Sequence, residues 1–131
     1  MNVFLVEDSA TLREHLGNML SEISGVVLTG HAEDEAGAIK SIDESAPDLV
    51  ILDLNLKSGS GIEVLKSIKL HHAKLKVMIL TNHADEMYVS RCMDAGADYF
   101  FDKSFQFMQV GAAIRQLAGC DELEHHCVTL Q

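Results

Sequence analysis

The stretch Pro47–Asn55, PDLVILDLN, decides the fold class of this chain. Its apolar residues enclose a single carboxylate, that of Asp53. A run this short, rich in branched residues and opened by proline, is typical of a strand that is buried on both faces of a parallel sheet. Asp53 then lies at the carboxyl end of the strand, the edge at which open parallel sheets bind ligands. Because an isolated ionised carboxylate is costly to bury, we expect Asp53 to face solvent or to pair with a metal or cation.

Strand and helix patterns alternate five times along the chain. Further short apolar strands are predicted over Asn2–Val6, Val26–Ala32, Lys76–Leu80 and Tyr99–Phe101. After each strand, apolar residues recur at helical spacing, and for the helix near Asp34–Ser45 the predicted inward face is Ala36, Ile39 and Ile42. Each connection carries a helix and is no tight strand hairpin, so this order predicts an α/β fold, a doubly wound five-stranded parallel sheet with helices on both faces.

Length and composition indicate one globular domain. The chain has 131 residues, of which 47% are hydrophobic and 23% charged, and its apolar runs are far shorter than the ~20 residues needed to span a bilayer. The beginning, MNVFLVEDS, lacks the basic leader of a signal peptide. The three cysteines show no CxxC spacing, which argues against a disulfide framework or a zinc site. We therefore expect a soluble cytoplasmic protein that contacts no membrane.

The charge of the chain argues against direct nucleic-acid binding. The net charge is −10, whereas duplex binding relies on clustered lysine and arginine. Five of the ten cationic residues do lie between Lys57 and Lys76. They alternate with apolar residues, so we interpret them as the solvated face of a helix and of the loop that follows it.

Polar side chains follow four of the predicted strands. Glu7 and Asp8 follow the first strand, Asp53 the third, Thr81 the fourth and Lys103 the fifth. In a sheet of order 2-1-3-4-5 these side chains share one edge, with the first and third strands at the topological switch point. Carboxylates gathered there repel one another unless a divalent cation lies between them, and the donor set suits Mg²⁺ better than Ca²⁺ or Zn²⁺. A lysine and a hydroxyl beside the metal can hold phosphate oxygens.

Taken together, these residues resemble the receiver domain of two-component response regulators, which has a flavodoxin-like fold. The resemblance implies that Asp53 is the phosphoacceptor and that a Mg²⁺ ion is held by Glu7, Asp8, Asp53 and the backbone carbonyl of Asn55. Asn55 and His83 lie two residues beyond the acceptor and the threonine, where they are placed to tune dephosphorylation.

The same resemblance identifies the residues that would respond to phosphorylation of Asp53. Thr81 matches the hydroxyl that follows the phosphoryl group, Lys103 the cation that pairs with it, and Phe100 the aromatic residue that rotates on activation. One residue departs from the family pattern, because Ser104 stands where a proline usually follows the lysine. A serine strongly favours a trans peptide bond, so we expect the loop that carries Lys103 to differ in path or mobility.

The resemblance also implies domain limits and partners. We expect a receiver domain over residues 1–118 and a short polar tail over 119–131. A sensor histidine kinase or a phosphotransfer protein would donate the phosphoryl group. The fourth helix, fifth strand and fifth helix would present the activated face to a downstream protein or to a second copy of the chain. The protein would act as a signalling phosphoacceptor rather than as an enzyme.

Three alternatives remain open at this point. The chain could be the N-terminal receiver of a longer regulator with a DNA-binding output domain, although residues 121–131 contain no helix-turn-helix pattern. A Mg²⁺-dependent phosphohydrolase of the haloacid dehalogenase type also uses an aspartyl nucleophile, but it needs a second acid where this chain has Asn55. A flavodoxin-like flavin binder needs a phosphate-cradling loop where Glu7 and Asp8 would repel the FMN phosphate.

Overall fold

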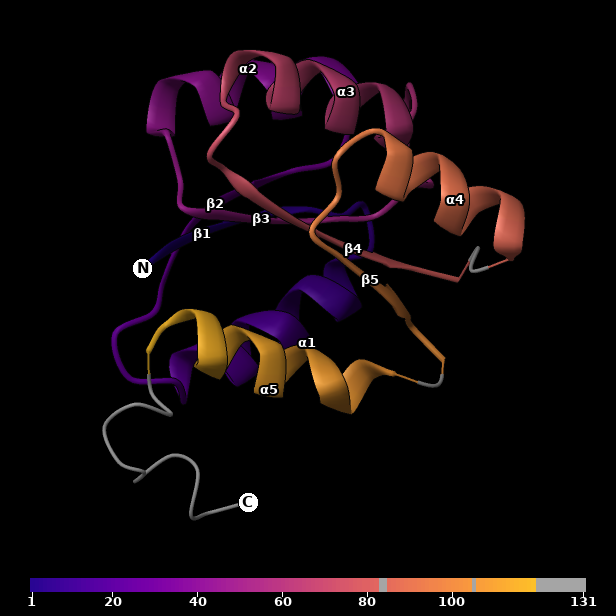
Figure 1. Ribbon diagram of the computed structural model, residues 1–131. Helices are drawn as coiled ribbons and strands as arrows, with labels where there is room; N and C mark the ends of the chain where they lie inside the picture. The colour runs from indigo at the N-terminus through magenta and orange to yellow at the C-terminus, as the bar shows by residue number, and fades with distance from the viewer. Residues whose placement is uncertain (83–84, 105, 120–131) are drawn as a thin grey trace.

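A computed structural model of the protein describes residues 1–82, 85–104 and 106–119, in which strands and helices alternate along the chain (Figure 1). The strands are β1 (Asn2–Val6), β2 (Val27–Ala32), β3 (Leu49–Leu52), β4 (Lys76–Thr81) and β5 (Tyr99–Asp102). The helices are α1 (Ala10–Ser21), α2 (Glu35–Ser45), α3 (Gly61–His71), α4 (Glu86–Asp94) and α5 (Phe107–Leu117). In this part of the chain, no helix is both long enough and apolar enough to cross a bilayer.

The strands form one parallel sheet in the order β2-β1-β3-β4-β5, which confirms the predicted fold class. Helices α1 and α5 cover one face of the sheet, and α2, α3 and α4 cover the other (Figure 1). From β1 the chain moves outward to β2 and then returns to β3 on the other side of β1. The carboxyl ends of β1 and β3 therefore lie side by side at the switch point, where this fold class places ligands.

Strand β3 is buried on both faces, as its sequence predicts. Leu49 and Ile51 pack into the core between the sheet and helices α1 and α5. Val50 and Leu52 pack into the core on the opposite face, against residues of α2, α3 and α4. These residues are at most 2% exposed, so the strand holds the next residue, Asp53, at a fixed place in the sheet.

Helix α3 begins directly against the backbone of Asp53. The N–H of Gly61 donates to the carbonyl oxygen of Leu54 at 3.1 Å. A Cβ atom at Gly61 would lie 2.3 Å from the carbonyl oxygen of Asp53, a distance at which the backbone would have to shift. Only glycine permits this approach, and the loop between β3 and α3 therefore returns close to Asp53.

The predicted inward face of α2 is partly wrong. The buried residues of this helix are Ala38 and Ile42, whereas Ala36 is exposed and Ile39 is half-buried. Ala36 and Ile42 are six residues apart in the sequence. On a helix with 3.6 residues per turn they therefore lie about 120° apart around the axis and cannot face the same surface. The spacing of four between Ala38 and Ile42 follows the face that covers the sheet.

We expected the lysines between Lys57 and Lys76 to be solvated, but one of them is not. Lys57, Lys66 and Lys76 are exposed, but the Lys69 ammonium is largely buried. Its Nζ donates to the Leu75 carbonyl at 2.7 Å and to Asp98 Oδ2 at 2.8 Å. The partner carboxylate lies 29 residues away, just before β5, so the helical pattern of α3 alone could not reveal the ion pair.

Candidate functional site

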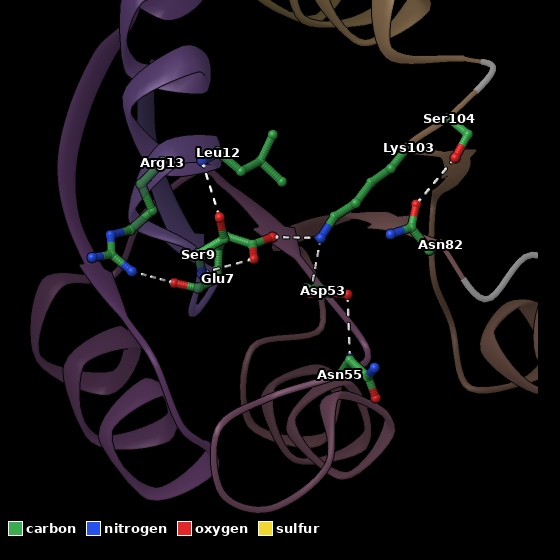
Figure 2. Close-up of polar contacts among 9 residues, drawn as sticks. All are labelled: Glu7, Ser9, Leu12, Arg13, Asp53, Asn55, Asn82, Lys103 and Ser104. Carbon is green, nitrogen blue, oxygen red and sulfur yellow. Dashed lines mark hydrogen bonds and ion pairs between the residues drawn. The ribbon is translucent and has the colours of Figure 1, made fainter.

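The strand order brings the predicted polar residues to one cleft at the carboxyl edge of the sheet (Figure 2). The backbone N–H of Asp53 donates to the carbonyl of Val6, the last residue of β1, at 2.9 Å, which sets the acceptor beside Glu7. The cleft is lined by Glu7, Asp8, Ser9, Asp53, Asn55, Leu56, Thr81, Asn82 and Lys103. Six of the residues assigned from the sequence are thus brought together, and His83 lies outside the described residues.

Lys103 bridges the two buried carboxylates of the cleft. Its Nζ lies 3.0 Å from Glu7 Oε1 and 3.0 Å from Asp53 Oδ2 (Figure 2). Glu7 and Asp53 are only 3% and 4% exposed, so each needs a nearby positive charge. Burial by itself would lower the pKa of the Lys103 ammonium, but the charge of Asp53 and the hydrogen bonds to Glu7 and Asp53 outweigh burial and raise that pKa. Lys103 is therefore held in its charged form.

The pKa of the Glu7 carboxyl is raised above its ordinary value. Burial raises the pKa of its carboxyl, and the negative charge of Asp53 raises it further, while hydrogen bonds from the Ser9 backbone and from Lys103 act in the opposite direction. The Ser9 N–H donates to Glu7 Oε2 at 3.0 Å, and Ser9 Oγ caps α1 by accepting from the Leu12 N–H at 3.2 Å. The start of α1 thus fixes the orientation of the Glu7 side chain.

The carboxylates of Glu7, Asp8 and Asp53 fit a small divalent cation. One oxygen from each lies within 4.8 Å of the others, and Asp8 is exposed while its two neighbours are buried. Two oxygens bound to the same Mg²⁺ ion lie at most about 4.2 Å apart, a separation close to the limit found for this cluster. Hard oxygen donors without histidine or cysteine suit Mg²⁺.

Asn55 orients the acceptor from the other side. Its backbone N–H donates to Asp53 Oδ1 at 3.2 Å, while Lys103 occupies Oδ2 (Figure 2). The loop that carries Asn55 is joined to the loop between β2 and α2. The Glu35 N–H donates to the Ser58 carbonyl at 3.0 Å, and Glu35 Oε1 accepts from the Ser60 N–H at 3.0 Å. Both oxygens of Asp53 are therefore held in place, Oδ1 by the Asn55 N–H and Oδ2 by Lys103.

Of the two switch residues assigned from the sequence, Thr81 lines the cleft and Phe100 does not. Thr81 is the last residue of β4 and is fully buried. Phe100 is half-buried on the sheet face that α4 covers, where Leu56 and Tyr88 also pack against the core. The peptide bonds in the described part of the chain are all trans, the one before Ser104 included, as the serine predicts.

The site also contains residues that were not assigned to it from the sequence, among them Asn82 and Arg13. Asn82 lines the cleft, and its position directly after Thr81 could have revealed this. Arg13 donates from a guanidinium nitrogen to the Glu7 carbonyl at 2.8 Å (Figure 2). Its guanidinium also lies 3.7 Å from the Glu33 carboxylate. Nothing in the spacing of Arg13 pointed to that contact, because it depends on how α1 packs over the end of β1.

Comparison with known proteins agrees with this arrangement. A family model of the response regulator receiver domain matches residues 3–115. The response regulator UvrY of Escherichia coli K12 is 29% identical over 117 residues, and the response regulator protein VraR of Staphylococcus aureus Mu3 is 28% identical over 116. The matches cover 89% and 88% of this chain but 54% and 56% of those proteins, so the chain spans about half the length of the curated relatives it matches.

Solved structures show the same fold. The response regulator domain of Thermotoga maritima CheB superimposes with a TM-score of 0.78 at 26% identity, covering 90% of this chain and 92% of that one. A LuxR-family two-component response regulator from Aurantimonas superimposes with a TM-score of 0.83 at 25% identity, covering 90% of this chain and 84% of that one. The family match spans most of the sequence, and the chain therefore belongs to the response regulator receiver domain family.

Proposed function

We propose that Asp53 accepts a phosphoryl group and that the acidic cluster holds a Mg²⁺ ion during the transfer. The observation that carries this proposal is the convergence of Glu7, Asp8, Asp53 and Lys103 on one cleft. A nucleophilic carboxylate, acidic metal ligands and a cation for the transferred group are the components that phosphoryl transfer requires. The family match favours this function over a phosphohydrolase or a flavin binder.

The residues of the cleft account for the chemistry of the transfer. One oxygen of the Asp53 carboxylate attacks phosphorus in line with the leaving group, and the leaving group keeps the electron pair of the bond that breaks. Lys103 already contacts Asp53, and it moves to the new phosphoryl oxygens while Thr81 offers its hydroxyl. A Mg²⁺ ion held by Glu7, Asp8 and Asp53 would supply positive charge to the same oxygens. Catalysis here consists of positioning and charge stabilisation, and the protein modifies itself rather than turning over a separate substrate.

The proposal is tested by chemical mapping of the phosphorylated residue. The wild-type chain is incubated with acetyl phosphate and Mg²⁺, the acyl phosphate is reduced with borohydride, and the modified residue is located by tandem mass spectrometry. We expect modification at Asp53 that is lost when EDTA replaces Mg²⁺. Modification at another residue, or labelling at Asp53 that does not depend on a divalent ion, would contradict the assignment.

We expect Mg²⁺ to stabilise the protein specifically. Binding to the folded state alone contributes RT ln(1+[L]/Kd), which is about 2.7 kcal/mol at one hundred times Kd. Thermal melting should therefore rise with MgCl₂ and not with NaCl of equal ionic strength. Asp8→Ala should abolish the difference, whereas Asp94→Ala, which removes an exposed carboxylate from the far end of α4, should retain it. Equal shifts in both salts would indicate general screening instead of a site.

We propose that α4, β5 and α5 form the face through which the phosphorylated receiver, residues 1–118, contacts a downstream protein or a second copy. Met87 on α4 and Met108 on α5 are 65% and 85% exposed, and the net charge of −10 disfavours DNA. A sensor histidine kinase or a phosphotransfer protein would donate the phosphoryl group. Phe105, another candidate contact, lies outside the described residues.

Activation should strengthen this protein contact. Beryllofluoride mimics the phosphoryl group, and a coupling of ~1–3 kcal/mol would raise the affinity for the partner or for a second copy. Size-exclusion chromatography and partner pull-down with and without beryllofluoride measure the effect, and Met108→Glu should reduce it. A salt-sensitive mobility shift of DNA by the isolated chain, with no contact that depends on activation, would refute the proposal.

A further inference from the structure

A second polar pair borders the cleft on the side of Thr81 and Lys103. Asn82 follows Thr81 at the end of β4, and Ser104 follows Lys103 after β5. Ser104 Oγ donates to Asn82 Oδ1 at 3.3 Å, which joins the two loops (Figure 2). Asn82 also lines the cleft that contains Asp53, so the pair connects the surface of the molecule to the site of phosphorylation.

In the structure, the Asn82 carboxamide is turned with its oxygen to Ser104 and its nitrogen to the cleft. Figure 2 shows the amide oxygen of Asn82 directed to Ser104 and the amide nitrogen directed to the side of Lys103 and Asp53. A carboxamide has one oxygen acceptor and an NH₂ group with two donor hydrogens. With its oxygen bonded to the serine hydroxyl, Asn82 presents donors to the space in which a phosphoryl group on Asp53 would lie.

We propose that the Asn82 NH₂ group donates a hydrogen bond to an oxygen of the phosphoryl group on Asp53, and that Ser104 is a positioning residue that holds Asn82 in this orientation. The inference rests on the proposed role of Asp53 as the acceptor. The opposite orientation would direct the lone pairs of Oδ1 at anionic oxygens and would be repelled. Hydrogen bonds to an ionised acceptor are about twice as strong as neutral ones, so a correctly turned Asn82 contributes most when the phosphoryl group is present.

Ser104 is suited to this role because the fold uses both of its polar groups. Its backbone N–H donates to Asp102 Oδ1 at 2.7 Å, and this contact fixes the path of the chain beyond Lys103. Its hydroxyl is then free to reach across to the neighbouring loop. A proline at this position would remove both donors, whereas threonine would keep them.

The bond between Ser104 and Asn82 acts on orientation and not on the stability of the fold. Both residues are exposed, and 3.3 Å is long for a bond donated by a hydroxyl, so the bond contributes little to the free energy of unfolding. Ser104→Ala should therefore fold normally, and its effect on phosphorylation can be read directly.

The experiment measures the initial rate of Asp53 phosphorylation by acetyl phosphate in saturating Mg²⁺. Asn82→Ala and Asn82→Asp should each lower the rate about tenfold or more, the scale of losing one hydrogen bond to a charged group. Ser104→Ala should also lower it, and Ser104→Thr should restore the wild-type rate. Ser24→Ala, a matched change in an exposed turn at the opposite edge of the sheet, should have no effect.

The double variant separates a positioning role from a general structural one. If Ser104 acts through Asn82, Ser104→Ala combined with Asn82→Ala should be no slower than Asn82→Ala alone. The Mg²⁺ affinity measured by thermal shift should stay unchanged in the alanine and threonine variants, because none of them adds or removes a carboxylate at the acidic cluster. Independent, multiplicative losses would overturn the role of Ser104.

Failure of the inference and failure of the proposed function give different results. If wild-type Asp53 is labelled and Asn82→Ala is labelled equally fast, Asn82 is not a donor and only the inference fails. If wild-type Asp53 is not labelled at all, the proposed function fails and the inference falls with it.

Discussion

Replacing Asp53 with asparagine should abolish phosphorylation of this chain by acetyl phosphate and Mg²⁺. The carboxamide has no anionic oxygen with which to attack phosphorus, whereas in the wild-type chain Lys103 and the Asn55 N–H hold the two oxygens of the Asp53 carboxylate in the cleft. The expected loss is complete, whereas variants that only disturb the surroundings should slow the reaction.

The Asp53→Asn variant should remain folded, so its loss of labelling can be assigned to chemistry. The remaining oxygen of asparagine can accept from Lys103, and removal of one negative charge relieves Glu7, whose pKa is raised by burial and by Asp53. Intact-protein mass spectrometry measures the label, and thermal melting checks the fold. Asp94→Asn serves as the matched control in an exposed position. Stoichiometric labelling of Asp53→Asn would reject the assignment of the acceptor.

Lys103→Met should cause the largest loss of stability among single changes at this site. Methionine keeps most of the length of the side chain but leaves the carboxylates of Glu7 and Asp53 buried without a cation. Breaking a buried ion pair costs about 3–5 kcal/mol, and we expect a value near the lower limit because the Lys103 side chain is 17% exposed. Urea unfolding in EDTA measures the loss. Lys66→Met, which removes an exposed lysine paired with Glu63, should change stability by less than about 0.5 kcal/mol.

The deficit of Lys103→Met should depend on pH and on metal. A folded state that raises the pKa of Glu7 binds more protons than the unfolded state, so its stability falls as pH rises from the ordinary glutamate value of 4.5 through the raised pKa. Without Lys103 this fall should be larger and extend to higher pH, and Mg²⁺ should recover part of the loss at neutral pH. A deficit that is equal at all pH values and insensitive to Mg²⁺ would show that lost packing, and not charge, explains it.

The sequence predicted the sheet and most of the site because both depend on local pattern. Leu49–Leu52 could be assigned to a doubly buried strand from composition alone, and Glu7, Asp53, Thr81 and Lys103 followed because parallel strands end at a common edge. The assignment of Mg²⁺ to the acidic cluster and the roles of the individual residues stay predictions until the experiments above are done.

The features that the sequence did not predict all depend on three-dimensional packing. The Lys69–Asp98 ion pair and the Ser104–Asn82 hydrogen bond join residues 29 and 22 positions apart, and no periodicity reports such pairs. The face of α2 was misjudged at Ala36 because a spacing of three was followed from Ala36 through Ile39 to Ile42, and this spacing turns away from the face on which Ala38 and Ile42 lie. Which face is buried is decided by how the helix packs against β2 and α3.

The loops on the two sides of the cleft are joined by hydrogen bonds of different strength, and this difference affects the route by which a phosphodonor reaches Asp53. On the metal side, the loops after β2 and β3 are joined through Glu35 by two hydrogen bonds of 3.0 Å, and by a bond of 3.2 Å from the Lys57 N–H to the Glu33 carbonyl. On the other side, the Lys103 N–H donates to the Thr81 carbonyl at 3.0 Å, and beyond these residues the described parts of the loops after β4 and β5 are joined by the longer, exposed bond between Ser104 and Asn82. Loops that are joined by weaker, exposed hydrogen bonds open more readily. A bulky donor would therefore enter past Asn82 and Ser104, while the metal ligands stay in place throughout its approach.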